Sequence, residues 1–242
     1  MFEELIKSAI EILNAKGYEC YHETSLNGIE GITVPGKTKM FFPVINDNAD
    51  MYAEYIISCI KDAETLHIDE RKISPFLIRV AGNEELLEMV PHRFYNDLAL
   101  IYYVIFSGGN LNIATSTITN ANMKLYAENE EALFEKALQT AREELVISPM
   151  NAILPIGNAP GGLYVLSNKR NYRGSGCIIA ALDMIPEDSW ILPSSIHELI
   201  ITPGGNEEQR DILTNLIRSV NETEVKDSEI LSDHPYRISD FR

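Results

Sequence analysis

Residues 163–203 read LYVLSNKRNYRGSGCIIAALDMIPEDSWILPSSIHELIITP, and the fold and the candidate sites are best approached from this stretch. It holds three short apolar segments, separated by the turn-forming residues Asn, Gly, Pro and Ser. It also holds the basic cluster KRNYRGSG at 169–176, and SSIHE at 194–198, which brings Ser, His and Glu together. Hairpins and candidate functional residues are therefore both expected here.

The same alternation of apolar segments and turns continues toward the N-terminus. Residues 98–106 are nine consecutive apolar residues, which predict a central strand. Gly108-Gly109-Asn110 then leads into LNIATSTIT, a hairpin partner. Apolar residues at helical spacing predict helices near 2–13, 52–63, 130–145 and 206–221. Because hairpins outnumber regular strand–helix–strand units, we expect an α+β fold, a mainly antiparallel sheet with helices packed on it.

Three short stretches carry local structural signals. The Pro- and Gly-rich stretch 147–162 predicts a surface loop. Asn206 and Gln209 resemble a capping box at the start of the last helix. Ile178 and Ile179, which follow Cys177, indicate a buried strand.

The chain of 242 residues is 45% hydrophobic, which is enough to build a sizeable core. No repeat or low-complexity segment divides it. We expect one globular domain over 1–242, or two subdomains of about 1–91 and 92–242.

Charge and cysteine content narrow the function classes. Twenty Lys+Arg against 36 Asp+Glu give a formal charge of −16, which repels phosphate backbones and anionic lipids, so neither direct nucleic-acid binding nor membrane binding is expected. Cys20, Cys59 and Cys177 are an odd number and far apart, which favours reduced thiols and a cytoplasmic location. The acidic, helical N-terminus lacks the pattern of an export signal.

Ser195, His197 and Glu198 are the residue types of a nucleophile, a base and an orienting acid. In an extended segment Ser195 and His197 share a face and Glu198 points away, so the acid would have to come from elsewhere. In a helix Ser195 and Glu198 would form a capping box. His197-Glu198 begins like a zinc-protease motif, but Ile201 stands where the second histidine belongs, so no metal site is expected.

The basic loop is a candidate ligand- or partner-binding segment. Its glycines and its cations Lys169, Arg170 and Arg173 resemble a phosphate cradle, but the spacing fits neither a dinucleotide fingerprint nor a P-loop, so no cofactor is expected. A plain solvated turn is the alternative. The candidate binding residues in this loop and in the 193–198 turn are Lys169, Arg170, Tyr172, Arg173, Ser194, Ser195 and His197.

Three blocks, LLEMVPHRFYNDLALIYYVIF at 86–106, SWILPSSIHELIITP at 189–203 and VNETEVKDSEILSDHPY at 220–236, resemble a bacterial family called domain of unknown function 5688, as does LYVLSNK at 163–169. The order of strands and helices is more distantly similar to domain of unknown function 1444. Neither resemblance implies an activity, a substrate or a catalytic residue.

The first functional hypothesis is therefore a non-enzymatic binding protein for an unknown protein or small-molecule partner, acting through the basic loop and the 193–198 turn. A hydrolase-like enzyme with Ser195 as nucleophile and His197 as base is the first alternative. The second alternative is an acidic decoy of a DNA-binding protein.

Overall fold

The computed structural model describes residues 2–24, 30–35, 40–45, 47–65, 67–108, 111–153 and 162–242. These residues form helices and three antiparallel sheets, which confirms the α+β prediction. The chain divides into two compact units, 1–68 with 106–114, and 69–105 with 115–242. The expected subdomains of about 1–91 and 92–242 stay a prediction.

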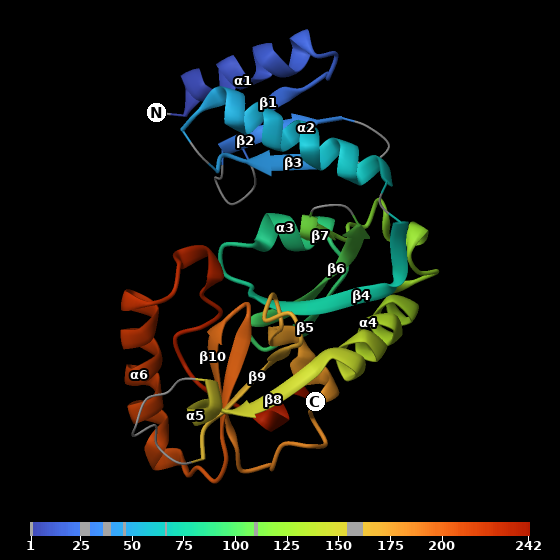
Figure 1. The fold of residues 1–242 in the computed structure, drawn as a ribbon. Helices are drawn as coiled ribbons and strands as arrows, with labels where there is room; N and C mark the ends of the chain where they lie inside the picture. Colours follow the sequence, from blue (N-terminus) through green and yellow to red (C-terminus); the bar gives the residue numbers. More distant parts are fainter. Residues whose placement is uncertain are drawn as a thin grey trace. The chain divides into compact units, whose positions relative to one another are not determined.

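The first unit contains α1 (Glu3–Ala15), β1 (Tyr21–Thr24), β2 (Glu30–Val34), β3 (Met40–Pro43) and α2 (Ala49–Thr65). Strands β1, β2 and β3 pair in that order, and α1 and α2 lie side by side against them (Figure 1). Helix α1 ends just before Gly17, whose φ of 88° suits the left-handed turn that closes a helix. Asn48 caps α2, because its side chain accepts a hydrogen bond from the N–H of Met51.

A second sheet is built around the apolar strand. Its elements are β4 (His67–Arg79), α3 (Glu84–Met89), β5 (His92–Tyr95), β6 (Leu98–Gly108) and β7 (Leu111–Thr117). Strand β6 lies between β4 and β5 and also pairs with β7, so the central strand and its hairpin are confirmed. Gly109 and Asn110 of the expected turn lie outside the described residues. Strand β5 was not predicted, because a run of four residues after a proline carries little periodicity.

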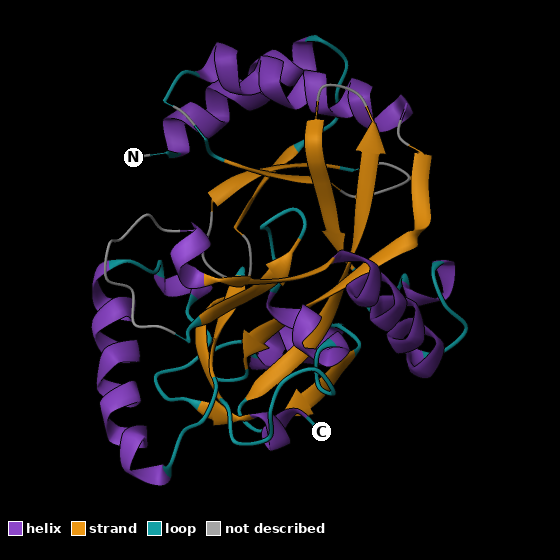
Figure 2. Cartoon of the chain, turned by 60° about the horizontal axis from the view of Figure 1, so that its bottom comes forward, coloured by secondary structure: helices purple, strands orange, loops and turns teal. Residues whose placement is uncertain are grey.

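A third sheet contains most of residues 163–203. Its strands are β8 (Leu145–Pro149), β9 (Tyr164–Asn168), β10 (Trp190–Ser195), β11 (Glu198–Thr202) and β12 (Tyr236–Arg237), in the order β12-β10-β11-β9-β8. Helix α4 (Glu130–Glu144) runs directly into β8, and α6 (Arg210–Thr223) covers β10 (Figures 1 and 2). Ile217 and Leu213 of α6 pack against Trp190 and Leu192 of β10. The predicted helices at 130–145 and 206–221 are therefore confirmed.

The shorter helical elements of the described chain are α5 (Met150–Ile153), η1 (Met123–Leu125), η2 (Ser175–Ala180), η3 (Glu207–Gln209), η4 (Asp227–Glu229) and η5 (Ile238–Phe241).

Three local expectations are wrong. The expected loop at 147–162 begins with β8 and α5, because β8 gains its hydrogen bonds from β9, while 154–161 lie outside the described residues. The expected strand at Ile178 and Ile179 belongs to helix η2. Gly176 places this helix so close to β4 that an added Cβ would be 2.4 Å from the Pro75 carbonyl carbon. The Asn206 side chain caps no helix and contacts Glu208 instead.

Candidate functional site

The basic loop and the β10–β11 turn, which the sequence offered as two separate candidates, lie against each other. We call residues 169–176 the anchored loop. The N–H of Gly174 donates a hydrogen bond of 3.0 Å to the carbonyl oxygen of His197, and the N–H of Ser175 donates one of 3.3 Å to that of Ile196. An added Cβ on Gly174 would be 2.5 Å from Ser167 Oγ, so this close approach requires glycine.

Asn168 organises the start of the anchored loop. Its buried side chain accepts hydrogen bonds from the N–H groups of Arg170 (3.1 Å) and Tyr172 (3.2 Å), and it donates one of 2.8 Å to the Tyr172 carbonyl. These bonds hold a tight turn in which Asn171 and Arg173 have φ values of 51° and 49°. A left-handed backbone is unfavourable for an arginine, so the surrounding bonds must maintain it.

Arg170 points inward and fixes the anchored loop to its surroundings. Its guanidinium forms an ion pair with Glu144 at the end of α4 and donates a hydrogen bond of 3.1 Å to Ser74 Oγ on β4. Burial by itself would lower the pKa of Arg170, but hydrogen bonds with Glu144 and Tyr103 outweigh burial and raise it. The charge of Arg170 is therefore neutralised inside the protein, and its role is to position the loop.

Arg173 is held differently. Its guanidinium carbon lies 4.7 Å from the ring centre of Phe76, 5.4 Å from that of Tyr172 and 5.8 Å from that of Tyr103. Its Nε is buried without a hydrogen-bond partner. No carboxylate of the described side chains pairs with it, and its Nη atoms, unlike Nε, are not buried without a partner. The result is a guanidinium surrounded by three aromatic rings, and no described carboxylate pairs with it.

His197 lies between Arg173 and an acid. Its Nδ1 accepts a hydrogen bond of 3.1 Å from the N–H of Arg173, and the centre of its ring lies 5.4 Å from that of Tyr172, with the two ring planes tilted by 48°. Its Nε2 lies 3.6 Å from Glu229 Oε1 on η4. Because Nδ1 acts as an acceptor, the geometry fits the neutral imidazole with its hydrogen on Nε2.

The Ser195 hydroxyl does not contact the imidazole. Ser195 Oγ accepts a hydrogen bond of 3.1 Å from the backbone N–H of His197, and Ser195 pairs with Glu198 across the hairpin. The segment is therefore neither a single strand nor a helix, because Ile196 and His197 form a turn held by hydrogen bonds from other segments. The side chain of Ser194 lies outside the described part, and Lys169 is exposed.

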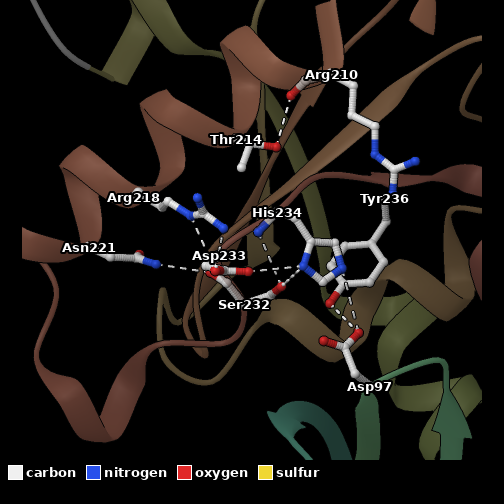
Figure 3. Close-up of polar contacts among 9 residues, drawn as sticks. All are labelled: Asp97, Arg210, Thr214, Arg218, Asn221, Ser232, Asp233, His234 and Tyr236. Carbon is white, nitrogen blue, oxygen red and sulfur yellow. Dashed lines mark hydrogen bonds and ion pairs between the residues drawn. The ribbon is translucent and has the colours of Figure 1, made fainter.

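A second polar cluster, which no sequence candidate included, lies where β12 meets the β5–β6 turn (Figure 3). The Tyr236 hydroxyl donates a hydrogen bond of 2.6 Å to Asp97 Oδ1. His234 lies between two carboxylates, with Nδ1 3.1 Å from Asp233 Oδ1 and Nε2 3.8 Å from Asp97 Oδ1. Arg218 of α6 pairs with the other oxygen of Asp233 at 2.9 Å. The hydrogen bond from His234, and then Arg218, lower the pKa of Asp233.

Ser232 Oγ lies 3.0 Å from His234 Nδ1, so this cluster does bring a serine, an imidazole and carboxylates together. The serine is buried, however, and its Oγ also accepts a hydrogen bond from the backbone N–H of His234, two residues later in the chain. This hydrogen bond forms a local turn. Nδ1 in turn faces Asp233, so it is not free to accept the serine proton. We therefore interpret the second cluster as a set of polar contacts that hold β12, α6 and the β5–β6 turn together.

Neither cluster is arranged as a metal centre. Over the residues that the structure describes, no group of three His, Cys, Asp or Glu side chains could hold a metal ion. In the same residues, no helix is long and apolar enough to cross a bilayer.

Sequence reasoning identified Tyr172, Arg173 and His197 but missed the residues that surround them, namely Ser74, Phe76, Tyr103, Glu144 and Glu229. None of these five carries a motif, and they come from four separate elements, with Ser74 and Phe76 both on β4. The second cluster has one signal in the sequence, SDHPY at 232–236, which contributes to the family resemblance but forms no catalytic motif.

The fold defines an α+β protein. Residues 44–239 match the model of a family of unknown function, DUF5688, and the chain belongs to this family. No curated protein and no solved structure matches the chain. The more distant similarity to domain of unknown function 1444 stays a prediction.

Proposed function

We propose that this chain is a non-enzymatic binding protein, and that Arg173, beside Tyr172 and with its backbone N–H held by His197, binds an anionic group of a small molecule or a protein partner. The group is a carboxylate or a phosphate, since both are planar or multidentate acceptors that suit the forked donors of a guanidinium. The one observation that carries the proposal is Arg173, stacked against three aromatic rings with its terminal donors unpaired among the described side chains.

The chain's overall charge makes this arrangement informative. In a protein with a formal charge of −16, an arginine has many carboxylates available. Arg93, Arg170, Arg218, Arg237 and Arg242 each pair with one, whereas Arg79, Arg142 and Arg210 form no ion pair among the described side chains. Arg173 instead depends on aromatic contacts, which hold a guanidinium in place without neutralising its charge. The positive charge of Arg173 therefore remains available to a ligand.

The surroundings also favour binding over catalysis. The anchored loop is fixed at its base by Asn168 and Arg170, and at its end by Gly174, so an incoming anion meets a site that is already ordered. Ser195 Oγ bonds to a backbone N–H instead of an imidazole nitrogen, so the hydrolase alternative has no activated nucleophile at this turn.

Affinity capture from the protein's own cells tests the proposal. The wild type, Arg173→Gln and the control Arg142→Gln, which changes an exposed arginine on α4, are each purified at native level. Mass spectrometry then identifies the small molecules and proteins that co-elute. We expect a partner with a carboxylate or phosphate group, recovered with the wild type and the control and lost with Arg173→Gln. Recovery of the same partner with all three chains, or of the bare protein each time, contradicts the proposal.

A further inference from the structure

The hydrogen bond between the Arg173 N–H and the His197 imidazole exists only while Nδ1 carries no proton. The two atoms are 3.1 Å apart, and Nδ1 is the acceptor. A doubly protonated imidazole is a donor at both nitrogens, so protonation would place two N–H groups against each other at this distance. Histidine is the side chain that ordinarily changes its charge between about pH 5 and 8. The contact is therefore sensitive to pH.

The charged and titratable groups in contact with this imidazole, among the described residues, come from two segments. Tyr172 and Arg173 face it from the anchored loop, and Glu229 faces it from η4. Lys226 lies 3.8 Å from the same Glu229 oxygen and reaches His197 only through that carboxylate. The imidazole therefore lies between a carboxylate on one side and the positively charged Arg173 on the other.

Protonation has two opposite effects on an anion bound at Arg173. The new positive charge would attract the anion, but Glu229 lies 3.6 Å from Nε2 and offsets much of that charge. The lost hydrogen bond acts directly on Arg173, whose left-handed backbone needs support from its neighbours. The second effect is local to the binding arginine, so we expect it to dominate.

We propose that His197 is a proton-sensitive switch of the anion site, which releases the Arg173 backbone and weakens anion binding when it is protonated. This inference rests on the proposed function. One backbone hydrogen bond typically contributes enough to change an equilibrium about fivefold. We therefore expect the affinity for an anion to fall about fivefold when His197 takes up its proton.

The test measures dissociation constants for sulfate and formate by NMR titration at about pH 7.5 and about pH 5.5, since neither ion changes its charge in this range. The wild type is compared with His197→Asn, whose side-chain oxygen can take the place of Nδ1 as acceptor but does not titrate. We expect the wild type to bind about fivefold more weakly at the lower pH, and the variant to bind equally at both.

The possible outcomes separate the two proposals. Equal or tighter wild-type binding at the lower pH overturns the switch and leaves the binding site intact. No binding by the wild type at either pH overturns the binding site itself. If His197→Asn does not fold, the Arg173 amide signal of the wild type is followed against pH together with the imidazole signals of His197. If the Arg173 amide signal and the His197 imidazole signals change together with pH, the switch is supported. If the Arg173 amide signal does not change with the imidazole signals, the switch is contradicted.

Discussion

The guanidiniums of Arg170 and Arg173, three residues apart in one loop, are held in opposite ways. Arg170 forms an ion pair with Glu144, and both side chains are at least 84% buried, with exposed fractions of 16% and 14%. Arg173 is stacked on aromatic rings and has no acid partner among the described side chains. Arg170 therefore fixes the position of the loop, whereas Arg173 is the cation that we propose as the ligand-binding residue.

Replacing Arg170 should destabilise the fold. Arg170→Met leaves the Glu144 carboxylate buried without its partner, so the free energy of unfolding should fall by about 3 kcal/mol. Urea unfolding measures this change. Arg142→Met is the matched control, because Arg142 is exposed near the end of α4, the helix that carries Glu144. This control should change the free energy of unfolding by less than about 0.5 kcal/mol. Equal small effects of the two substitutions would show that the buried pair does not anchor the loop.

Tyr236 should stabilise the second cluster through its hydroxyl. Tyr236→Phe removes the 2.6 Å hydrogen bond to Asp97 without changing the packing of the buried ring, and it should cost about 1 kcal/mol. The loss stays modest because the Asp97 side chain is 54% exposed and water can replace the phenol. Chemical denaturation of this variant is compared with that of Tyr164→Phe, which alters a half-exposed tyrosine on β9 and should be neutral. No difference between the two variants contradicts the prediction.

Asp233 should contribute stability that depends on pH. Its pKa lies below the ordinary value of 3.8, first because of His234 and then because of Arg218. A carboxylate with a lowered folded-state pKa stabilises the protein above its unfolded-state pKa, and this stabilisation is lost as the pH falls through the folded-state pKa. The difference in unfolding free energy between the wild type and Asp233→Asn should thus be present at neutral pH and disappear in acid. A difference that stays constant down to about pH 2 would contradict this assignment.

Cys177 should be unreactive in the folded protein. Burial, and secondarily Glu144, raise the pKa of its thiol to about 12. Because the thiolate is the nucleophile, alkylation by iodoacetamide at about pH 8 should modify Cys177 only after unfolding. Mass spectrometry of native and urea-unfolded samples measures the labelling of each cysteine, with the half-buried Cys20 as the internal comparison. Labelling of Cys177 in the native protein at the rate of Cys20 would show that the thiol is accessible.

The sequence predicted the elements whose signal is local. Helix α4 has its Asn129 cap and a regular apolar face, and β6 has an uninterrupted apolar run, so both could be recognised without tertiary information. Strand β8 could not, because its five residues become a strand only by pairing with β9. Helix η2 could not either, because its compact path depends on the contact between Gly176 and Pro75.

The candidate site was predictable only in part. The sequence marked the cationic loop and the Ser/His turn, but it could not show that Gly174 joins them or that Arg170 turns inward to Glu144. The position of Glu229 beside His197 depends on a hydrogen bond of 3.1 Å between the Ile196 N–H and the Glu229 carbonyl, two groups 33 residues apart. Contacts of this kind follow from chain topology, which residue spacing does not encode.

The most direct test of the account is the dissociation constant for sulfate at about pH 7.5, measured by NMR titration for the wild type, Arg173→Gln and Arg142→Gln. Loss of charge-assisted hydrogen bonds to the stacked guanidinium should weaken binding by Arg173→Gln at least about tenfold, while Arg142→Gln stays within about twofold of the wild type. The amide signals that shift should belong to the anchored loop and the Ile196–His197 turn. Equal sulfate affinity in all three chains would contradict the claim that Arg173 is the anion-binding residue.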